Sequence, residues 1–279
     1  MKLISKKEIK KPEETYNLHI ETDHNYIAND AVVSNCHMAK AEVLKKLLTQ
    51  NLRNAPIRWG LTGTVPKEDA EFQSILASLG PVVGQVSAKE LQDKGVLSNC
   101  HVNICQLIDT QAHSGYQEEL KYLVTNKERI EYIAKMMNNI KQSGNTLILV
   151  DRISAGQALA ELIPNSTFVN GSVKVKDRKD TYDTIREGTN EVIIATYGVA
   201  AVGLNIPRIF NLVLLEPGKS FVRVIQSIGR GVRKAKDKDF VQIWDVTSTC
   251  KYAKRHLTQR KKFYKDAEYP FTIEKIDWN

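Results

Sequence analysis

The sequence predicts an α/β protein in which a doubly wound parallel sheet follows a partial α/β unit and a small all-β unit. From residue 145 onward, short apolar runs alternate with helical segments, and this alternation favours a parallel sheet with helices on both faces. Residues 15–33 instead alternate with a period of two between turn residues, which is typical of β-structure. We therefore expect domains at residues 1–35, 36–110 and 111–279.

The N-terminal unit is short. Apolar residues recur at every second position from Tyr16 to Ile20, turn residues occupy 23–24 and 29–30, and 31–33 form another short strand. A β-unit of this size is too small to be stable by itself, so we expect it to need a partner.

Residues 36–110 are predicted to contain both helices and strands, unlike the β-rich segment before them. Apolar residues share one face of a predicted helix at 39–52, and "IRWGLTGTV" (57–65) is a strand that runs into a Gly/Thr turn. "FQSILASLG" is a helix ended by Gly80, and "HVNICQLI" is a further strand. We interpret this region as the remainder of an α/β domain.

From residue 111 onward the alternation is regular. Charged helical sequence fills 117–141, and buried-type strands then alternate with helices. The strands are expected at 146–151, 167–171, 192–197, 211–216 and 241–246, and the helices at 154–162, 174–187 and 221–233. A basic helix at 250–265 and a short strand follow. Functional groups should lie in loops at the carboxyl ends of the strands.

Composition narrows the function classes. Lys and Arg number 40 against 32 Asp and Glu, and the formal net charge of +8 suits a polyanionic partner such as nucleic acid. No apolar run approaches the ~20 residues of a membrane span, and the N-terminus lacks a signal peptide's apolar stretch, so we expect a cytoplasmic protein. Cys100-His101 and Cys105 lack a second ligand pair, so we expect no metal site there.

The stretch "QSIGRGVRK" is the most specific signal in the second half. On a helix, Gln226, Arg230 and Arg233 fall at i, i+4 and i+7 and share one face. Guanidinium groups match phosphate oxygens bidentately, so this face suits an anionic ligand. The alternative is a solvated basic face, but Gly229 costs helix stability of about 1 kcal/mol and favours close approach to the backbone.

Polar residues also follow the predicted strands. In "ATYGVAAVGLNIP", Thr196 and Tyr197 end a strand, Asn205 offers an amide, and Gly198, Gly203 and Pro207 shape the following loop. The alternative is that this stretch is an ordinary strand–loop–helix connection without a functional role. "GLTGT" (60–64) and "VDRIS" (150–154) show similar polar groups at strand ends, which favours a shared functional edge.

"EPGKS" (216–220) imitates the end of a phosphate-binding P-loop. A P-loop needs a glycine five residues before its last glycine, and Val213 stands at that position. We interpret the stretch as a surface turn. The sequence contains no other P-loop pattern, so we expect that this chain does not hold a nucleoside triphosphate unaided.

Taken in order, "CHMAK", "GLTGT", "TLILVDRIS", "FVNGS", "IIATYGVAAVGLNIP" and "QSIGRGVRK" resemble the successive motifs of superfamily 2 helicases. The nearest type is the UvsW-like recombination and repair helicases of phages, and the resemblance runs from Cys36 to about Trp278. It implies two RecA-like domains that clamp ATP and Mg²⁺ between them, a DNA partner, and an infected bacterial cytoplasm as location. The P-loop and the Asp-Glu of the metal-binding box would lie upstream of Cys36.

The resemblance also implies roles for individual residues. Cys36-His37 would complete a D-E-C-H box, and Thr62 and Thr64 would couple ATP turnover to domain closure at the DNA-binding surface. The residues implied to line the DNA track are Asp151, Arg152, Thr196 and Tyr197. The residues implied to face ATP are Gly203, Asn205, Gln226, Arg230 and Arg233. The two arginines would stabilise charge on the transferring phosphoryl group. Asn205 departs from the acid that the family often has there.

The segment "HNYIANDAVVSNC" resembles the end of the C-terminal fragment of a split intein, a small all-β (Hint-type) unit. Asn35 would close a succinimide and cut the Asn35–Cys36 bond, and the Cys36 thiol would take over the upstream flank as a thioester. His24 would act as acid and base. Ser34 stands where the family often has a histidine, which would leave more of this work to His24.

The predicted junction falls inside the D-E-C-H box. We therefore expect a separate polypeptide that carries the P-loop, ends in Asp-Glu and bears the N-terminal intein fragment. Two alternatives remain open on the sequence. The RecA-like module and its basic tail could bind nucleic acid without catalysis, or the N-terminal segment could be a degenerate intein, in which case replacing Asn35 would change nothing.

Overall fold

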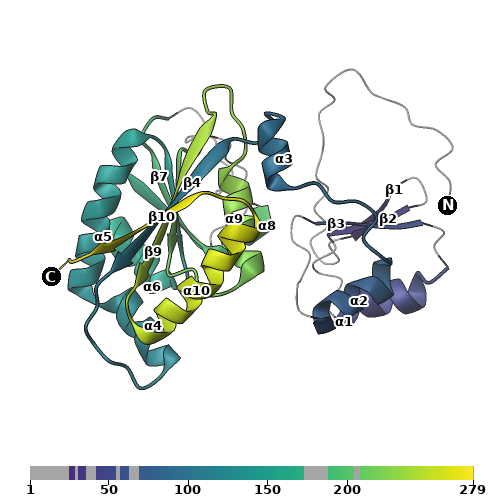
Figure 1. Cartoon of the computed structure of the whole chain (residues 1–279), viewed down its shortest axis with the longest axis horizontal. Helices are drawn as coiled ribbons and strands as arrows, with labels where there is room; N and C mark the ends of the chain where they lie inside the picture. The colour runs from purple at the N-terminus through teal and green to yellow at the C-terminus, as the bar shows by residue number, and fades with distance from the viewer. Residues whose placement is uncertain are drawn as a thin grey trace. The chain divides into compact units, whose positions relative to one another are not determined.

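The computed structural model describes residues 25–28, 31–35, 42–54, 57–62, 69–172, 188–203, 206 and 208–278. The chain divides into two compact units, Met1–Val83 and Gly84–Asn279 (Figure 1). Among the described residues, no helix is both long and apolar enough to cross a membrane.

The first unit contains a three-stranded sheet in the order β1-β2-β3. Strands β1 (Asn25–Ala28) and β2 (Ala31–Asn35) are antiparallel, as the alternation and the turn at 29–30 predict. Strand β2 pairs in parallel with β3 (Ile57–Leu61), and the register sets Asn35 opposite Leu61. The residues before and after the proposed junction therefore belong to one sheet.

Helical segments accompany this sheet. Helix α1 (Glu42–Lys46) continues into a π-helical turn, η2 (Leu47–Asn51), and α2 spans Asp69–Leu79. Leu48 and Ile75 are buried against each other and form a small apolar cluster with their neighbours. The cluster joins η2 to α2, as the apolar face predicted for residues 39–52 requires.

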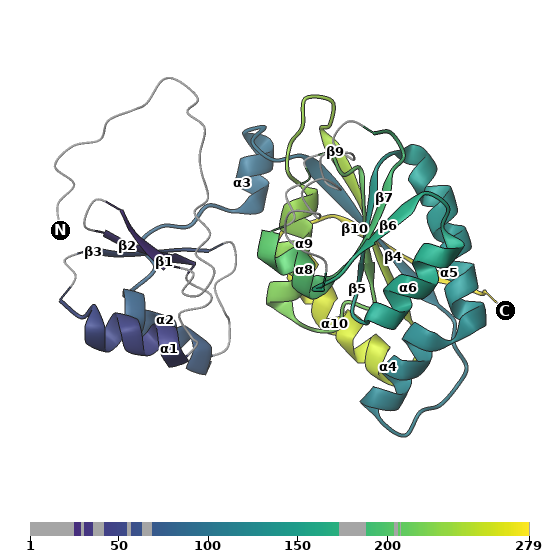
Figure 2. The ribbon, with the colours of Figure 1, turned by 180° about the vertical axis from the view of Figure 1, so that it is seen from behind.

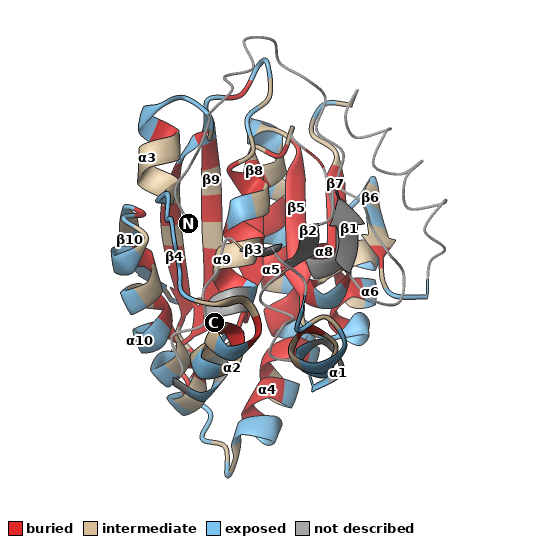
Figure 3. Ribbon diagram, turned by 90° about the vertical axis from the view of Figure 1, so that its right-hand side faces the viewer, coloured by how far each residue is buried: buried red, intermediate tan, exposed pale blue. Residues whose placement is uncertain are grey.

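The second unit is a seven-stranded, fully parallel sheet in the order β10-β4-β9-β8-β5-β7-β6. Its strands are β4 (Asn99–Leu107), β5 (Thr146–Val150), β6 (Ser166–Val169), β7 (Val192–Thr196), β8 (Asn211–Leu215), β9 (Phe240–Ser248) and β10 (Phe271–Ile276). Strands β5 and β8 are buried at every residue, because both of their faces are covered by helices (Figure 3).

Helices cover both faces of this sheet, as a doubly wound fold requires (Figures 1 and 2). Its helices are α3 (Ala88–Asp93), α4 (Tyr116–Thr125), α5 (Lys127–Ile140), α6 (Ile153–Leu162), α8 (Tyr197–Gly203), α9 (Phe221–Gly231) and α10 (Lys251–Asp266), with a 3₁₀ turn η3 (Lys141–Ser143). One core packs α5 and α6 against the sheet, and the other packs α8, α9 and α10 against the opposite face.

Three expectations about the elements are corrected by the structure. Strand β4 lies inside the large sheet, paired with β9 and β10, so the contacts divide after Val83 rather than after residue 110. The segment 117–141 is two helices, because the Asn126 side chain caps a new helix by accepting a hydrogen bond from the Arg129 N–H at 2.9 Å. The stretch after Thr196 continues as helix α8 rather than as a loop.

Candidate nucleotide and nucleic-acid site

The carboxyl ends of β5, β7 and β8 meet at one cluster, where parallel sheets place their ligands. Asp151 follows β5, and its Oδ1 accepts a hydrogen bond from Nη1 of Arg223 on α9 at 2.7 Å. The Arg223 guanidinium also lies 5.1 Å from the ring centre of Tyr197, which follows β7. The Tyr197 hydroxyl donates to the Leu215 carbonyl at the end of β8, at 3.3 Å. Arg223 and Tyr197 together thus link the ends of three strands.

Burial raises the pKa of Tyr197 well above its ordinary value, so this hydroxyl stays protonated and acts as a donor. Arg223 and Asp151 keep part of their surface, with side chains 39% and 25% exposed. The buried Tyr197 therefore contacts the Arg223–Asp151 ion pair, which a ligand can still reach.

Arg152 stands beside this pair and precedes the first turn of α6. Its Nε lies 3.7 Å from Asp151 Oδ2, and its Nη2 donates to Gln117 Oε1 of α4 at 3.4 Å. The side chain is half exposed, so a cationic group is presented at the strand ends. The structure brings together Asp151, Arg152, Thr196 and Tyr197, as the expectation of a shared edge requires.

Helix α9 begins at this cluster. Gly218 adopts a left-handed φ of +72° in the turn before it, and Ser220 Oγ accepts a hydrogen bond from the Arg223 N–H at 3.3 Å. The stretch "EPGKS" is therefore a turn and a helix cap, as expected from Val213, and its serine positions the backbone of Arg223.

The second half of α9 carries Gln226 and Arg230. Gln226 and Arg230 lie within the helix and are half buried. Arg233 lies beyond the helix, which ends at Gly231, so the expected single helical face of three residues is corrected. Residue 233 instead pairs in an antiparallel bridge with Leu97.

Two features fix this end of α9. A Cβ at Gly231 would approach Leu212 Cδ2 of β8 to 3.0 Å, so the glycine permits close packing of helix on strand. The buried Lys238 Nζ donates to the carbonyls of Gly231 and of Arg233, the latter at 2.9 Å. Burial lowers the pKa of Lys238 to about 8. This lysine therefore caps the carboxyl end of α9.

The donor set at this end fits a phosphate group. Gln226, Arg230 and Arg233 supply one amide and two guanidinium groups, all half buried, and a guanidinium group can donate two parallel hydrogen bonds to phosphate oxygens. Burial lowers the pKa of Arg233, but a guanidinium remains protonated in proteins. Gly229 is exposed, and a Cβ there would meet nothing within 4 Å.

Sequence reasoning missed two buried arginine networks. Arg129 donates to Glu216 Oε1 at 2.7 Å and to the Leu123 carbonyl at 2.7 Å, and its Nε lies 3.4 Å from Asp109 Oδ2. The guanidinium thereby joins α5 to the segments that follow β4 and β8, just beneath the strand ends. Arg129 lies in a helix rich in charged residues, so the sequence does not distinguish this buried arginine from exposed ones.

The second network centres on Asp245 in β9. Both of its oxygens accept hydrogen bonds from Arg260 of α10 at 2.8 Å, and Oδ2 accepts another from the Tyr264 hydroxyl at 2.7 Å. An aspartate inside a predicted buried strand signals a buried cation nearby, because an unpaired charge there is costly. The identity of the cation comes only from the fold.

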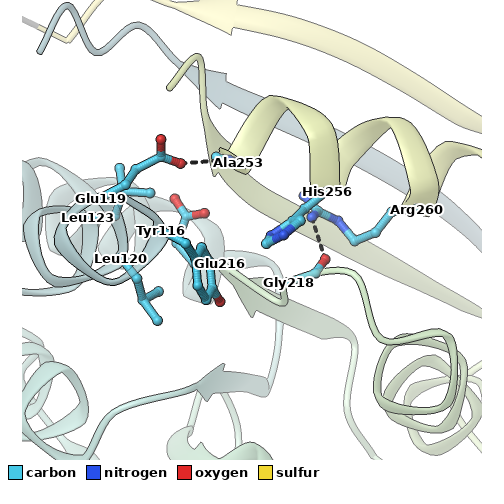
Figure 4. Close-up of a pocket in the computed structure, with 9 residues that line it drawn as sticks. All are labelled: Tyr116, Glu119, Leu120, Leu123, Glu216, Gly218, Ala253, His256 and Arg260. Carbon is cyan, nitrogen blue, oxygen red and sulfur yellow. Dashed lines mark hydrogen bonds between the residues drawn. The ribbon is translucent and has the colours of Figure 1, made fainter. Parts of the chain in front are cut away.

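A pocket opens between α4 and α10, lined by Tyr116, Glu216, His256 and others (Figure 4). Its volume is about 10 Å³, roughly the space of one water, so it cannot enclose a nucleotide. The described residues contain no group of three or more His, Cys, Asp or Glu that could hold a metal ion.

Several predicted site residues are not placed. His24, Cys36, His37, Thr64 and Asn205 lie outside the described residues. Of the rest, Ser34 and Asn35 end β2, Thr62 directly follows β3, and Gly203 ends α8.

Residues 128–235 match the family model described as the helicase conserved C-terminal domain. The match begins in α5 and includes the Asp151 cluster and all of α9. This region is therefore similar to helicase C-terminal domains, and the similarity includes the strand ends and α9.

Two known proteins extend the similarity. The ATP-dependent DNA helicase uvsW of Enterobacteria phage T4 is 24% identical over 239 residues, which are 82% of this chain and 47% of that protein. The crystal structure of T4 UvsW has a TM-score of 0.57 at 21% identity, and the match covers 88% of this chain and 54% of that one. The structure of S. cerevisiae Dbp5 bound to RNA and ADP BeF3 has a TM-score of 0.56 at 15% identity, and the match covers 89% of this chain and 59% of that one.

At these identities the solved structures show a common fold. The chain spans less than half the length of the curated T4 relative. The N-terminal β-unit has no counterpart in the matched family region, which starts at residue 128.

Proposed function

We propose that this chain is the C-terminal half of an ATP-dependent DNA helicase, which protein trans-splicing joins to a separate half that carries the P-loop. The observation that carries the helicase proposal is helix α9. Its first turn brings Arg223 to Asp151 at the strand ends, and Gln226 and Arg230 lie one turn apart in its second half. One rigid helix thereby links a proposed DNA-binding cluster to a proposed phosphate-binding end.

In the joined protein, Gln226, Arg230 and Arg233 would contact ATP, with Gly203 and Asn205 nearby. The guanidinium groups would stabilise the charge that develops on the transferring phosphoryl group. Mg²⁺ would be held mainly by the Asp-Glu of the partner half, next to His37. This division of labour is supported by the absence of any P-loop pattern in the 279-residue sequence.

DNA would run along the strand ends of the second unit. Asp151, Arg152, Thr196 and Tyr197 would line this track, and Thr62 and Thr64 would couple it to the nucleotide. The net charge of +8 favours a polyanion. DNA is preferred over RNA because the curated T4 relative is named a DNA helicase.

The splicing proposal rests on residues 24–36. The Cys36 thiol would attack the acyl carbon at the end of the upstream flank and form a thioester, while the bond from that carbon to the N-terminal intein fragment breaks and the fragment leaves with the proton. Asn35 would then attack its own carbonyl carbon with its side-chain nitrogen, which closes a succinimide and breaks the Asn35–Cys36 bond. A shift of the acyl group from sulfur to the new Cys36 amine would leave an ordinary peptide bond. His24 would supply and accept protons, with Ser34 beside the cleaved bond.

The pairing of β2 with β3 supports this arrangement. Strand β2 ends at Asn35 and lies parallel to β3, in the manner of a neighbouring strand of a RecA-like sheet. After splicing, a strand of the partner that ends in Asp-Glu would lie beside β3 in place of β2. The metal-binding box would then be complete at the end of that strand.

Mass spectrometry of protein from the native source tests the splicing. The expected junction peptide ends in Cys-His-Met-Ala-Lys and carries upstream residues other than Ser34-Asn35, with Asp-Glu directly before Cys36. Asn35→Ala should block cleavage and leave the unspliced chain. Detection of the Ser34-Asn35-Cys36 peptide alone would overturn the splicing proposal.

A second assay tests the enzyme. DNA-stimulated ATP hydrolysis should appear in the joined product and be absent from either half alone. If the joined product binds DNA but hydrolyses no ATP, the domain is a nucleic-acid-binding module and the helicase proposal fails.

A further inference from the structure

Three aromatic rings lie between α4 and α10, beside the Asp151 cluster. The ring centre of Tyr116 is 5.2 Å from that of His256 and 5.9 Å from that of Tyr252, in edge-to-face geometry. Figure 4 shows Tyr116 and His256, from different helices, lining the same opening. No motif of the helicase region includes these residues, since α4 precedes residue 128 and α10 follows residue 235.

The rings keep solvent-facing surface. Tyr116 is 37% exposed, and Tyr252 and His256 are half buried. Burial, together with Arg260 and Lys219, lowers the pKa of His256, so its ring is largely uncharged at neutral pH. All three therefore offer neutral π-faces or edges at the surface.

Cations surround these rings. Lys251 Nζ lies 5.6 Å from the ring centre of Tyr252, and the Arg255 guanidinium lies 5.9 Å from it. On the other side, Nη2 of Arg152 donates to Oε1 of Gln117, the residue that follows Tyr116 on α4, at 3.4 Å. This contact links the aromatic cluster to the Asp151 cluster.

The acids at this surface are engaged in internal contacts. Glu119 is buried, and its two oxygens accept hydrogen bonds from the N–H groups of Tyr252 and Ala253, which caps α10. Glu216 is buried and accepts a hydrogen bond from Arg129. Their charges are therefore compensated within the fold, and the cations dominate the exposed surface.

We propose that Tyr116, Tyr252 and His256 stack on the bases of a single-stranded nucleic acid whose phosphates contact Lys251 and Arg255. Aromatic rings interleaved with cations suit a single strand, because its bases can leave their own stack and a duplex keeps them covered. The surface extends the track of Asp151 and Arg152 onto α4 and α10. The inference rests on the proposed nucleic-acid role of this domain, but it requires neither splicing nor ATP.

Fluorescence anisotropy with the full 279-residue chain, without ATP, tests this surface. The probes are labelled oligo(dT), labelled oligo(U) and a blunt DNA duplex. Tyr116→Ala should weaken binding of the single strand by roughly 5- to 150-fold, the range for loss of one stacked base, and change duplex binding little. Tyr116→Phe should retain most of the affinity. The oligo(dT) and oligo(U) arms show whether the strand is DNA or RNA, and tight binding of either supports the proposal.

The salt dependence of binding tests the contribution of the cations. Lys251→Gln should reduce the slope of log affinity against log salt by about 0.7 for a single strand. Lys135→Gln is the matched control, because this exposed lysine lies on α5 and covers the opposite face. Equal loss of slope in both variants, or wild-type affinity in Tyr116→Ala, would overturn the proposal. Since ATP and the partner half are absent from the assay, its failure is distinct from failure of the splicing or ATPase test.

Discussion

Helices α5 and α9 cover opposite faces of the same sheet, and their arginines differ in burial. Arg129 of α5 turns inward, is fully buried, and contacts two carboxylates and a carbonyl. Arg223 of α9 remains 39% exposed and pairs with one carboxylate, Asp151. Arg230, in the last turn of α9, is half buried.

The difference lies in the surroundings of each guanidinium. A buried arginine must have its donors satisfied, so Arg129 serves to fix β8 and the segment after β4. Arg223 and Arg230 keep part of their surface, so a ligand can reach them. Arg129 of α5 therefore maintains the fold, and Arg223 and Arg230 of α9 are the arginines that we assign to ligands.

The largest effect should come from the proposed phosphate contacts. In the joined protein, Arg230→Ala or Arg233→Ala should lower kcat for ATP hydrolysis by about 10³- to 10⁵-fold, because each removes charge stabilisation from phosphoryl transfer. Steady-state ATPase rates measure this. Lysine at either position should not restore the rate, since it lacks the forked geometry.

Stability provides the control for these variants. Both residues are half exposed, so the urea midpoint should change little. A variant that keeps its ATPase rate, or one that loses it only by unfolding, would remove that arginine from the nucleotide site.

The next largest effect should lie on the other face. Arg129→Leu should lower the free energy of unfolding by about 3–5 kcal/mol, because it leaves the buried Glu216 without its cation. Urea unfolding measures this loss. Arg152→Leu is the matched control, since this arginine is half exposed, and its loss should stay below about 1 kcal/mol. Equal losses in the two variants would contradict the contrast between the faces.

Much of the large sheet could be predicted from the sequence. Strands β5, β7 and β8 are continuous apolar runs, because parallel strands covered on both faces need no polar side, and their positions were expected within one residue. Strand β4 was assigned to the wrong sheet, since an apolar run does not encode its neighbour. The break at Asn126 was missed because the apolar pattern has helical period on both sides of it.

The candidate site, too, could be predicted only in part from the sequence. Motif order placed Asp151 and Tyr197 at strand ends and Arg230 on the helix after β8, and the structure has them there, while their roles stay predictions. The end of α9 before Arg233 was missed, since it depends on Gly231 and on Lys238, which contact each other only in the fold. The rings of α4 and α10 were missed for the same reason.

A smaller effect is expected at Lys238, which caps the end of α9. Lys238→Met should cost about 1–3 kcal/mol, because the carbonyls of Gly231 and Arg233 lose a buried donor. The cost should depend on pH. The folded pKa is about 8 against an ordinary 10.5, so between these values the unfolded chain binds more protons, and the wild type should gain stability relative to the variant as pH rises.

Urea unfolding of both proteins from pH 7 to pH 10.5 measures this difference. Lys238→Arg keeps a donor and should recover part of the lost stability. A difference between wild type and Lys238→Met that stays constant across the range would show that the lysine is not the group that titrates.

The smallest predicted effect comes from removing a helix cap, and it compares α9 with α5 directly. Ser220 and Asn126 both cap a helix by accepting a hydrogen bond from the arginine N–H three residues later, at 3.3 Å and 2.9 Å. Ser220→Ala and Asn126→Ala should each cost about 1 kcal/mol, because each leaves one helical N–H without its side-chain acceptor. Only the Ser220 variant should also weaken DNA binding, since it loosens the turn that carries Arg223 toward Asp151. If Asn126→Ala weakens DNA binding as much, cap loss acts through general stability, and the division of labour between α5 and α9 does not hold.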